Sequence, residues 1–195
     1  MQPKRLLVLT GVQNDFFRLP FGNTRMTPIL PKIADYVQNW DGDIIVVKET
    51  RLTKQLIELG HGTVPGIKPW NEMREHVNIG YAEHCIKWTD GWEIVPELMP
   101  VLKEKNEKSC RFRTVEAYGQ TWHDWGNNIA TYDQITVAGT KLEDQIVSTV
   151  YAIRAFRPDV SIKIPLSLCA GDSDQIFRTV CSILENAASL TWSLE

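Results

Sequence analysis

The sequence predicts a three-layer α/β/α fold built on a six-stranded, mostly parallel sheet, and three observations support this fold class. Apolar, often β-branched runs alternate with amphipathic helical segments along the chain. The first run, within residues 5–10, is apolar on both faces, which is typical of a central parallel strand. The chain has 195 residues, 43% of them hydrophobic, which is enough for one substantial core. We therefore expect residues 1–195 to form one domain.

The first three elements are predicted to be a βαβ unit. After the strand at residues 5–10, the segment 27–40 carries Ile29, Ile33 and Val37 at helical spacing. Residues 43–49 form a β-branched run that predicts the second strand. The later strands are expected at residues 108–113 (ending near Arg113), 134–138, 161–168 and 189–192.

The helix after the fourth strand has the clearest start signal of the chain. Thr140 and Glu143 have the spacing of a capping box, which predicts a helix beginning within a residue or two of Thr140. Its expected buried face carries four aliphatic side chains, Leu142, Ile146, Val150 and Ile153. A last helix is expected at residues 172–189, and a short one at 121–132. Residues 51–107, interrupted by glycines and prolines, predict loops and short pieces.

Composition excludes several classes of partner. The formal net charge is −3, with 21 basic and 24 acidic residues intermixed, so no basic stripe exists that would bind nucleic acid. No apolar run approaches the roughly 20 residues that cross a bilayer, so we expect no membrane contact. The four cysteines fit no paired metal-ligand spacing, and no signal peptide is visible, which favours a reducing, cytoplasmic location: Cys85, Cys110, Cys169 and Cys181.

Four stretches resemble signatures of the isochorismatase and nicotinamidase family of cysteine hydrolases, in the same order. They are LLVLTGVQNDFF, YAEHCIKWTDGWEIVPEL, EAYGQTW and ITVAGTKLEDQIVSTVYAIRA. They resemble, respectively, the family's first strand with Asp-x-Gln-x-Asp-Phe, its Trp-Pro-x-His-Cys and Gly-x-Glu-x-x-x-x-Leu segments, its Ala-Phe-x-x-Thr turn, and its Gly-x-x-x-x-x-Cys-Val helix start. The resemblance implies the isochorismatase-like, Rossmann-like fold, whose ligands bind outside the carboxyl ends of the strands.

The resemblance also implies that the family's chemistry is absent. In that family a cysteine attacks a carbonyl, an aspartate takes its proton and a lysine completes the triad. The matching positions here are Gln145, Gly11 and either Arg113 or Arg111. An amide is a poor nucleophile and glycine has no side chain to accept a proton. We expect no catalytic residues.

The nicotinamidase branch of the family binds a metal ion through an Asp-x-His pair after the second strand and a later histidine. This chain has Glu49 and Arg51 at the pair and keeps His84. One carboxylate and one imidazole beside an arginine are too few ligands for a firm site. We expect no metal ion and no other cofactor.

Several residues allow both a structural and a functional interpretation. Asp15 could replace the missing base, but an aspartate in such a loop more often accepts hydrogen bonds from backbone amides. Cys110, close to Arg111 and Arg113, could replace the nucleophile, although a buried and unreactive cysteine is commoner. The indole rings could line a pocket or fill the core, and both interpretations stay open: Trp88, Trp92, Trp122 and Trp125.

The expected ligand pocket lies at the carboxyl edge of the sheet and comprises Gly11, Asp15, Arg113, Tyr118 and Gln145. The family's aspartate is replaced by Gly11, so Arg113 would lack an acidic partner in this pocket. A dehydrated charge needs a partner, which favours a small anionic ligand. The leading hypothesis is a catalytically inactive protein that acts by binding, as a ligand sensor, a regulator or a non-catalytic partner in an assembly.

Two other hypotheses remain. One is a divergent hydrolase whose active site is rebuilt around Cys110, Asp15 or Thr10. The other is a purely structural protein whose pocket is filled by its own side chains. The indole-rich insertion between the second and fourth strands also predicts self-association into a homo-oligomer, or contact with other proteins.

Overall fold

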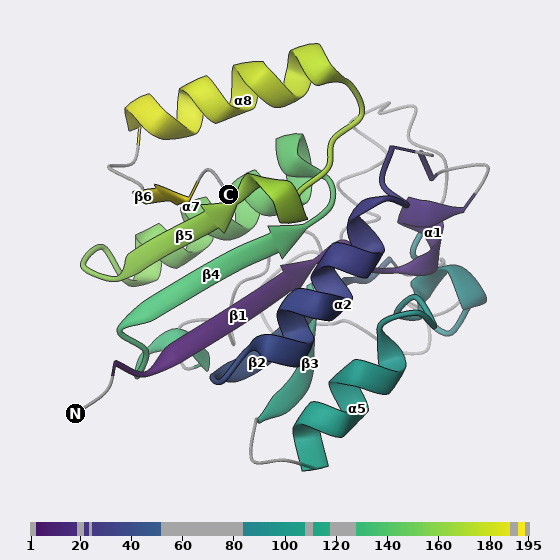
Figure 1. Cartoon of the computed structure of the whole chain (residues 1–195). Coiled ribbons are helices and arrows are strands. Elements are labelled where there is room, and N and C mark those ends of the chain that lie inside the picture. The colour runs from purple at the N-terminus through teal and green to yellow at the C-terminus, as the bar shows by residue number, and fades with distance from the viewer. Residues whose placement is uncertain are drawn as a thin grey trace, which may run out of the picture.

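The computed structural model describes residues 3–18, 22–23, 25–51, 84–107, 111–117, 128–187 and 191–193. Helices cover both faces of a twisted sheet, as Figure 1 shows. Within these residues no helix combines the length and the apolar content that crossing a membrane requires.

The sheet confirms the predicted fold class. Its strands are β1 (Arg5–Thr10), β2 (Asp43–Glu49), β3 (Phe112–Ala117), β4 (Gln134–Gly139), β5 (Ser161–Pro165) and β6 (Thr191–Ser193). The spatial order is β3-β2-β1-β4-β5-β6, and every neighbouring pair is parallel. Strands β2 and β3 therefore follow β1 toward one edge of the sheet, and β5 and β6 follow β4 toward the other edge. The topological switch point lies between β1 and β4, where such sheets bind ligands.

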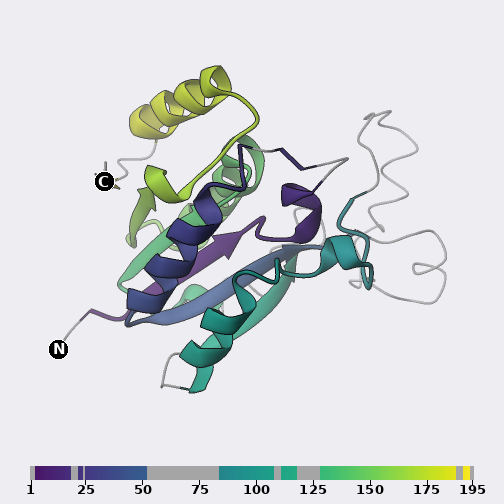
Figure 2. The ribbon, with the colours of Figure 1, turned by 45° about the vertical axis from the view of Figure 1, so that its right-hand side comes forward.

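The helices form two layers around this sheet. The longer ones are α2 (Ile29–Asn39), α5 (Met99–Glu107), α7 (Val147–Phe156) and α8 (Asp174–Ala187). The short ones are α1 (Asn14–Phe17), η1 (Asp90–Trp92), η2 (Leu142–Ile146) and η3 (Leu166–Leu168). Side chains of α2 and α5 share one apolar cluster, and those of α7 and α8 share the other. Figure 2 shows α2 and α5 side by side on one face.

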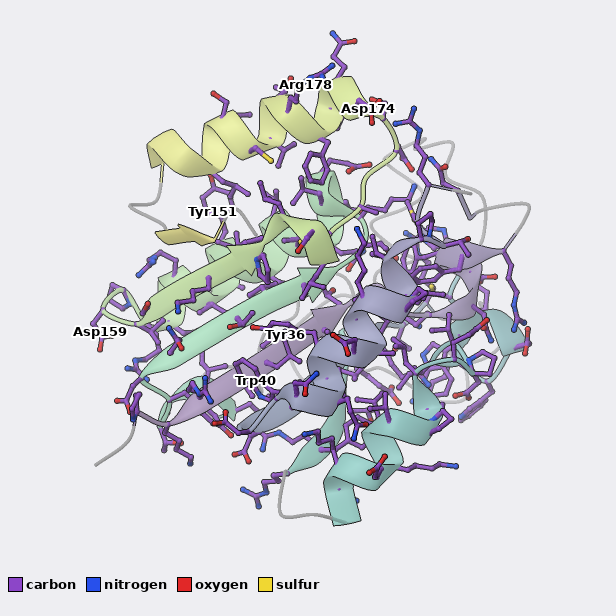
Figure 3. All side chains as sticks on the ribbon, viewed as in Figure 1. Tyr36, Trp40, Tyr151, Asp159, Asp174 and Arg178 are labelled. Carbon is purple, nitrogen blue, oxygen red and sulfur yellow. The ribbon has the colours of Figure 1, made fainter. Side chains whose placement is uncertain are left out.

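Hydrophobic periodicity explains why these layers form. Ile29, Ile33 and Val37 are buried on one face of α2, as predicted. The β1 side chains alternate between the two apolar clusters, so this strand is covered on both faces. Each such aliphatic side chain contributes roughly 1.5–3 kcal/mol when fully buried. Beside this core, the partly buried Tyr36 stacks on the buried Trp40 with ring centroids 5.6 Å apart (Figure 3).

The predicted boundaries of the third strand are wrong. The strand was expected to end near Arg113, but β3 begins at Phe112 and continues to Ala117. Strand β3 lies at the edge of the sheet and pairs with β2 alone. Its described side chains are all at least partly exposed. Such an edge strand needs no continuous apolar run, so the polar residues of FRTVEA concealed it. The expected helix at residues 121–132 lies largely outside the described residues.

One helix was missed and one cap was misassigned. Residues 99–107 were expected to be irregular, but they form α5, with Pro100 in the first turn where proline is tolerated. The capping box of Thr140 and Glu143 does not form. The Thr140 hydroxyl donates to the carbonyl of Gly11, and a Glu143 carboxylate oxygen accepts from the backbone N–H of Asp172. Contacts to distant segments thus replace the local pair. The helical turns still begin at Leu142, and the predicted apolar face is buried.

Candidate functional site at the carboxyl edge of the sheet

Gly11 follows β1 directly and lies at the switch point. Its φ is +63°, in the left-handed region that favours glycine. A Cβ atom at this position would overlap the carbonyl group of Thr140, and it would lie 2.8 Å from the Thr140 hydroxyl. That hydroxyl donates a hydrogen bond of 2.7 Å to the Gly11 carbonyl. The space that an aspartate side chain would need is therefore occupied by the backbone after β4.

Gln13 is a buried polar residue whose importance the sequence did not reveal. Its side-chain nitrogen donates to the carbonyls of Glu49 (2.9 Å) and Trp92 (2.8 Å), and its oxygen accepts from the backbone N–H of Glu49 (2.7 Å). One amide thus joins the segment after β1 to the end of β2 and to η1. An amide side chain between two strand ends satisfies backbone groups that the ladder no longer pairs. The only sequence signal was its place between an apolar strand and a polar turn.

Glu49 is the centre of the site. One carboxylate oxygen accepts from Arg51 Nε at 2.6 Å and lies 3.4 Å from His84 Nε2, and the other accepts from Gln145 Nε2 at 2.6 Å. The side chains of Glu49 and Arg51 are only 11% and 17% exposed. Burial alone would raise the pKa of Glu49, but the hydrogen bond from His84 and the charge of Arg51 outweigh it and leave the pKa below its ordinary value. Glu49 is therefore ionised at neutral pH.

Cys85 brings a thiol to the same place. Its Sγ, the Nε2 or Nδ1 of His84 and a carboxylate oxygen of Glu49 lie within 4.8 Å of one another. We call Glu49, Arg51, His84, Cys85 and Gln145 the Glu49 cluster. Burial, reinforced by the negative charges of Glu49 and Asp15, raises the pKa of the Cys85 thiol far above its ordinary value. This sulfur is protonated at neutral pH, and the sequence had not predicted its place in the site.

Asp15 has the structural role that the sequence favoured. A carboxylate oxygen of Asp15 accepts a hydrogen bond of 2.7 Å from the backbone N–H of Cys85, whose φ is +51°. A Cβ atom at Gly91 would overlap this carboxylate, so Gly91 leaves room for it. Asp15 thereby fixes the backbone that carries His84 and Cys85. The contact makes Asp15 a positioning residue for this segment.

Arg113 does not lie at this edge of the sheet. It pairs with Ile45, four positions before Glu49, and therefore lies roughly 13 Å along the sheet from the strand ends. Its guanidinium donates to the Asn128 carbonyl at 2.9 Å and lies near Tyr132, which precedes β4. Arg111 lies one residue before β3, further still from the carboxyl ends. Neither arginine therefore lies at the carboxyl ends of β1 and β2, and its assignment to the lysine position stays a prediction. Tyr118 and Cys110 lie outside the described residues.

No family model and no curated protein matches the sequence. Solved structures do match: a pyrazinamidase/nicotinamidase from Streptococcus mutans is 15% identical over 97% of this chain and 100% of its own, with a TM-score of 0.70. The chain has the isochorismatase-like fold.

Two further structures with the isochorismatase-like fold extend the likeness. An isochorismatase family protein from Desulfovibrio vulgaris is 19% identical over 98% of this chain and 94% of its own, with a TM-score of 0.65. A pyrazinamidase of Pyrococcus horikoshii in complex with zinc is 14% identical over 98% and 99% of the two chains, with a TM-score of 0.67. At these identities the likeness establishes the fold, and the residues of this chain must carry any argument about chemistry.

The Glu49 cluster does not fit a metal ion in its present arrangement. Glu49, His84 and Cys85 offer the oxygen, nitrogen and sulfur that zinc prefers. However, both carboxylate oxygens already accept hydrogen bonds, one of them from the guanidinium of Arg51. Within an isochorismatase-like fold, this chain therefore fills the cluster with its own cation.

The remaining indoles and grooves lie beside the cluster rather than in it. Trp92 is buried, donates to the Thr50 hydroxyl at 2.9 Å and contacts the ammonium of Lys48, whereas Trp88 is exposed. Trp122 and Trp125 lie outside the described residues. An open groove of about 560 Å³ runs between α1, η1 and α5, lined by Asn14, Glu93 and Met99 among others.

Proposed function

We propose that this chain is a catalytically inactive protein of isochorismatase-like fold that acts by binding. The observation that carries this proposal is the contact of Gln145. At the helix start where the fold's hydrolases would need a nucleophile, the Gln145 amide donates a hydrogen bond of 2.6 Å to the buried Glu49 carboxylate. A side chain held in this way positions a neighbour and cannot attack a carbonyl.

The position of the base supports the same proposal. At Gly11 no side chain fits beside the Thr140 backbone, so a base is missing and one cannot be added without moving the chain. The buried Glu49 carboxylate at the same edge of the sheet is occupied by three side-chain neighbours. In a well-studied hydrolase triad, loss of the nucleophile alone lowers turnover by about 10⁶.

One observation favours a second candidate, a divergent hydrolase. Cys85, His84 and Glu49 are a thiol, an imidazole and a carboxylate in one small cluster, and these residue types make a catalytic triad in other folds. What opposes it is the raised pKa of the Cys85 thiol, since nucleophilic cysteines have a lowered one. Of the other substitutes considered, Asp15 holds a backbone amide, Thr10 is fully buried, and Cys110 lies outside the described residues.

The expected result of an amidase assay is no turnover of nicotinamide or pyrazinamide above the buffer rate. The two amides are chosen because the solved structures of this fold include nicotinamidases and pyrazinamidases. Product release is followed by chromatography, with a working nicotinamidase as the positive control. Turnover that is lost in a Cys85→Ser variant would establish the hydrolase instead.

We also expect Cys85 to resist iodoacetamide at neutral pH. Its thiol is buried and protonated, whereas Cys181 on α8 is partly exposed and serves as the internal reference. Mass spectrometry after brief labelling of the folded protein should find Cys181 modified well before Cys85. Faster labelling of Cys85 than of Cys181 contradicts the inactive assignment.

A small anionic ligand stays a prediction, but Arg113 no longer supports it. The small anionic ligand was inferred from Arg113, which lies away from the strand ends. The cations that act on Cys85 in the Glu49 cluster, Arg51 and Lys48, are each paired with a carboxylate, Glu49 and Glu93 respectively. An anionic ligand would have to displace one of these carboxylates. Self-association and a non-catalytic role in an assembly are likewise predictions that size-exclusion chromatography with light scattering can examine.

A further inference from the structure

We propose that the guanidinium of Arg51 is a built-in substitute for a bound cation in the Glu49 cluster, and that removing it turns Glu49, His84 and Cys85 into a zinc-binding site. This inference concerns binding alone and does not depend on whether the chain is an active enzyme.

The contacts of Glu49 carry the first step. Arg51 Nε lies 2.6 Å from one carboxylate oxygen, and His84 Nε2 lies 3.4 Å from the same oxygen. A metal ion would have to take its place between that oxygen and the imidazole nitrogen, where the guanidinium now lies against the carboxylate. Arg51 thus blocks the ligand atoms that the ion would use.

Electrostatics carries the second step. A guanidinium is always charged and cannot give up a proton to make room for an ion. A divalent ion within a few ångströms of it would be repelled strongly in this partly dehydrated place. With Arg51 absent, the Glu49 carboxylate loses the cation that now lies 2.6 Å from its oxygen, and a divalent ion can take that place. The same ion would convert the neutral Cys85 thiol into a thiolate ligand with release of its proton to solvent.

The backbone carries the third step, because it holds the ligands in place without the Arg51 side chain. The N–H of Arg51 donates to the Cys85 carbonyl at 3.0 Å, and the N–H of Lys87 donates to the Arg51 carbonyl at 2.9 Å. Arg51 and Ile86 form an isolated parallel bridge. Asp15 also holds the backbone N–H of Cys85. A substitution at Arg51 therefore leaves the segment that carries His84 and Cys85 beside the end of β2.

The distances are close to those that zinc requires. The three ligand atoms lie within 4.8 Å of one another, and ligands around a tetrahedral zinc ion are about 3.5 Å apart. Side-chain rotations that move the ligand atoms by about an ångström close the difference. Water or a fourth side chain completes the coordination.

The test compares metal binding by the wild-type chain, Arg51→Met and Arg51→His. Methionine keeps the aliphatic stem without charge, and histidine adds a fourth ligand two residues after Glu49. Equilibrium dialysis should show that both variants bind one zinc ion per chain, with a dissociation constant at least roughly 10-fold lower than that of the wild-type chain, because a unit charge at this distance opposes the ion. Cobalt should give the near-ultraviolet absorption of a thiolate ligand, and Cys85→Ser in either background should remove it.

Arg25→Met is the matched control. Arg25 also pairs with a carboxylate, Asp174, but on the surface, so this variant should bind zinc no better than the wild-type chain. Tight stoichiometric binding by the wild-type chain overturns the proposal, and so does the absence of binding above this control in folded Arg51 variants. If both variants are unfolded without metal, zinc should restore their circular dichroism spectrum. Failure to do so also overturns it.

Discussion

Replacing Gly11 with alanine is expected to destabilise the protein by roughly 3 kcal/mol or more, which combines left-handed strain with overpacking. The φ of Gly11 is +63°, and an added Cβ would overlap the Thr140 carbonyl rather than a side chain that could rotate away. For a chain of this length the loss lowers the thermal midpoint by roughly 6–12 °C. Gly11→Asp should be at least as unstable and should gain no amidase activity. Chemical unfolding followed by circular dichroism measures both.

Thr140→Ala is the control for this prediction. It removes the hydroxyl that donates to Gly11 but leaves the backbone carbonyl in place, so it should cost only about 1 kcal/mol, the usual worth of one hydrogen bond. The double variant Gly11→Ala, Thr140→Ala should not recover stability, because the overlap is with backbone. A stable Gly11→Ala chain, or recovery in the double variant, would show that the segment after β4 is able to yield.

Replacing Glu49 with glutamine is expected to cost about 3 kcal/mol at neutral pH, because removal of one member of a buried ion pair leaves the other without compensation. Arg51 is the member left behind, and its side chain is 17% exposed. Glutamine preserves the shape of Glu49, so the loss reports charge rather than packing. Urea unfolding at pH 7 measures it. Asp90→Asn, which breaks the exposed pair of Asp90 with Arg18, should cost less than about 1 kcal/mol.

The effect of Glu49→Gln should depend on pH in one direction. The folded pKa of Glu49 lies below its ordinary value, so its contribution is fully present above the unfolded pKa of about 4.3 and is lost as the pH falls through the folded pKa. The stability of the wild-type chain should therefore fall in acid more steeply than that of the variant, and the difference between them should shrink. A difference that stays constant down to the folded pKa would mean that Glu49 acts through packing alone.

Some elements could be predicted because their signals are local. The bounds of β1 and β2 agree with the expected strands, and α2 lies within the expected helix. Their apolar residues repeat with the period of the element itself. The edge strand β3 lacks this property, and an error in its boundaries placed Arg113 in the pocket. Helix α5 was missed for the same reason, because its charged sequence has no regular repeat of apolar residues.

The candidate site was only partly predictable. Gly11 and Gln145 lie at the carboxyl edge as expected, and the resemblance pointed to Glu49, Arg51 and His84 as neighbours. The roles of Gln13 and Cys85 were not visible, since each depends on contacts with residues at least 34 positions away, such as the bond of Gln13 to Glu49 or the approach of Cys85 to the same residue. No local pattern encodes a contact at that separation.

By itself the amino-acid sequence determined the fold class, the order of most strands and helices, and the absence of a thiol at the start of the helix after β4. Periodicity and residue identity settle these points, because each is a property of one short segment. Only the tertiary structure decided that Glu49 is shared by Arg51, His84 and Gln145, and that a backbone carbonyl occupies the side-chain space at Gly11. The physical reason is that parallel strands bring their carboxyl ends together from distant parts of the chain, so the partners of a buried charge depend on register and packing.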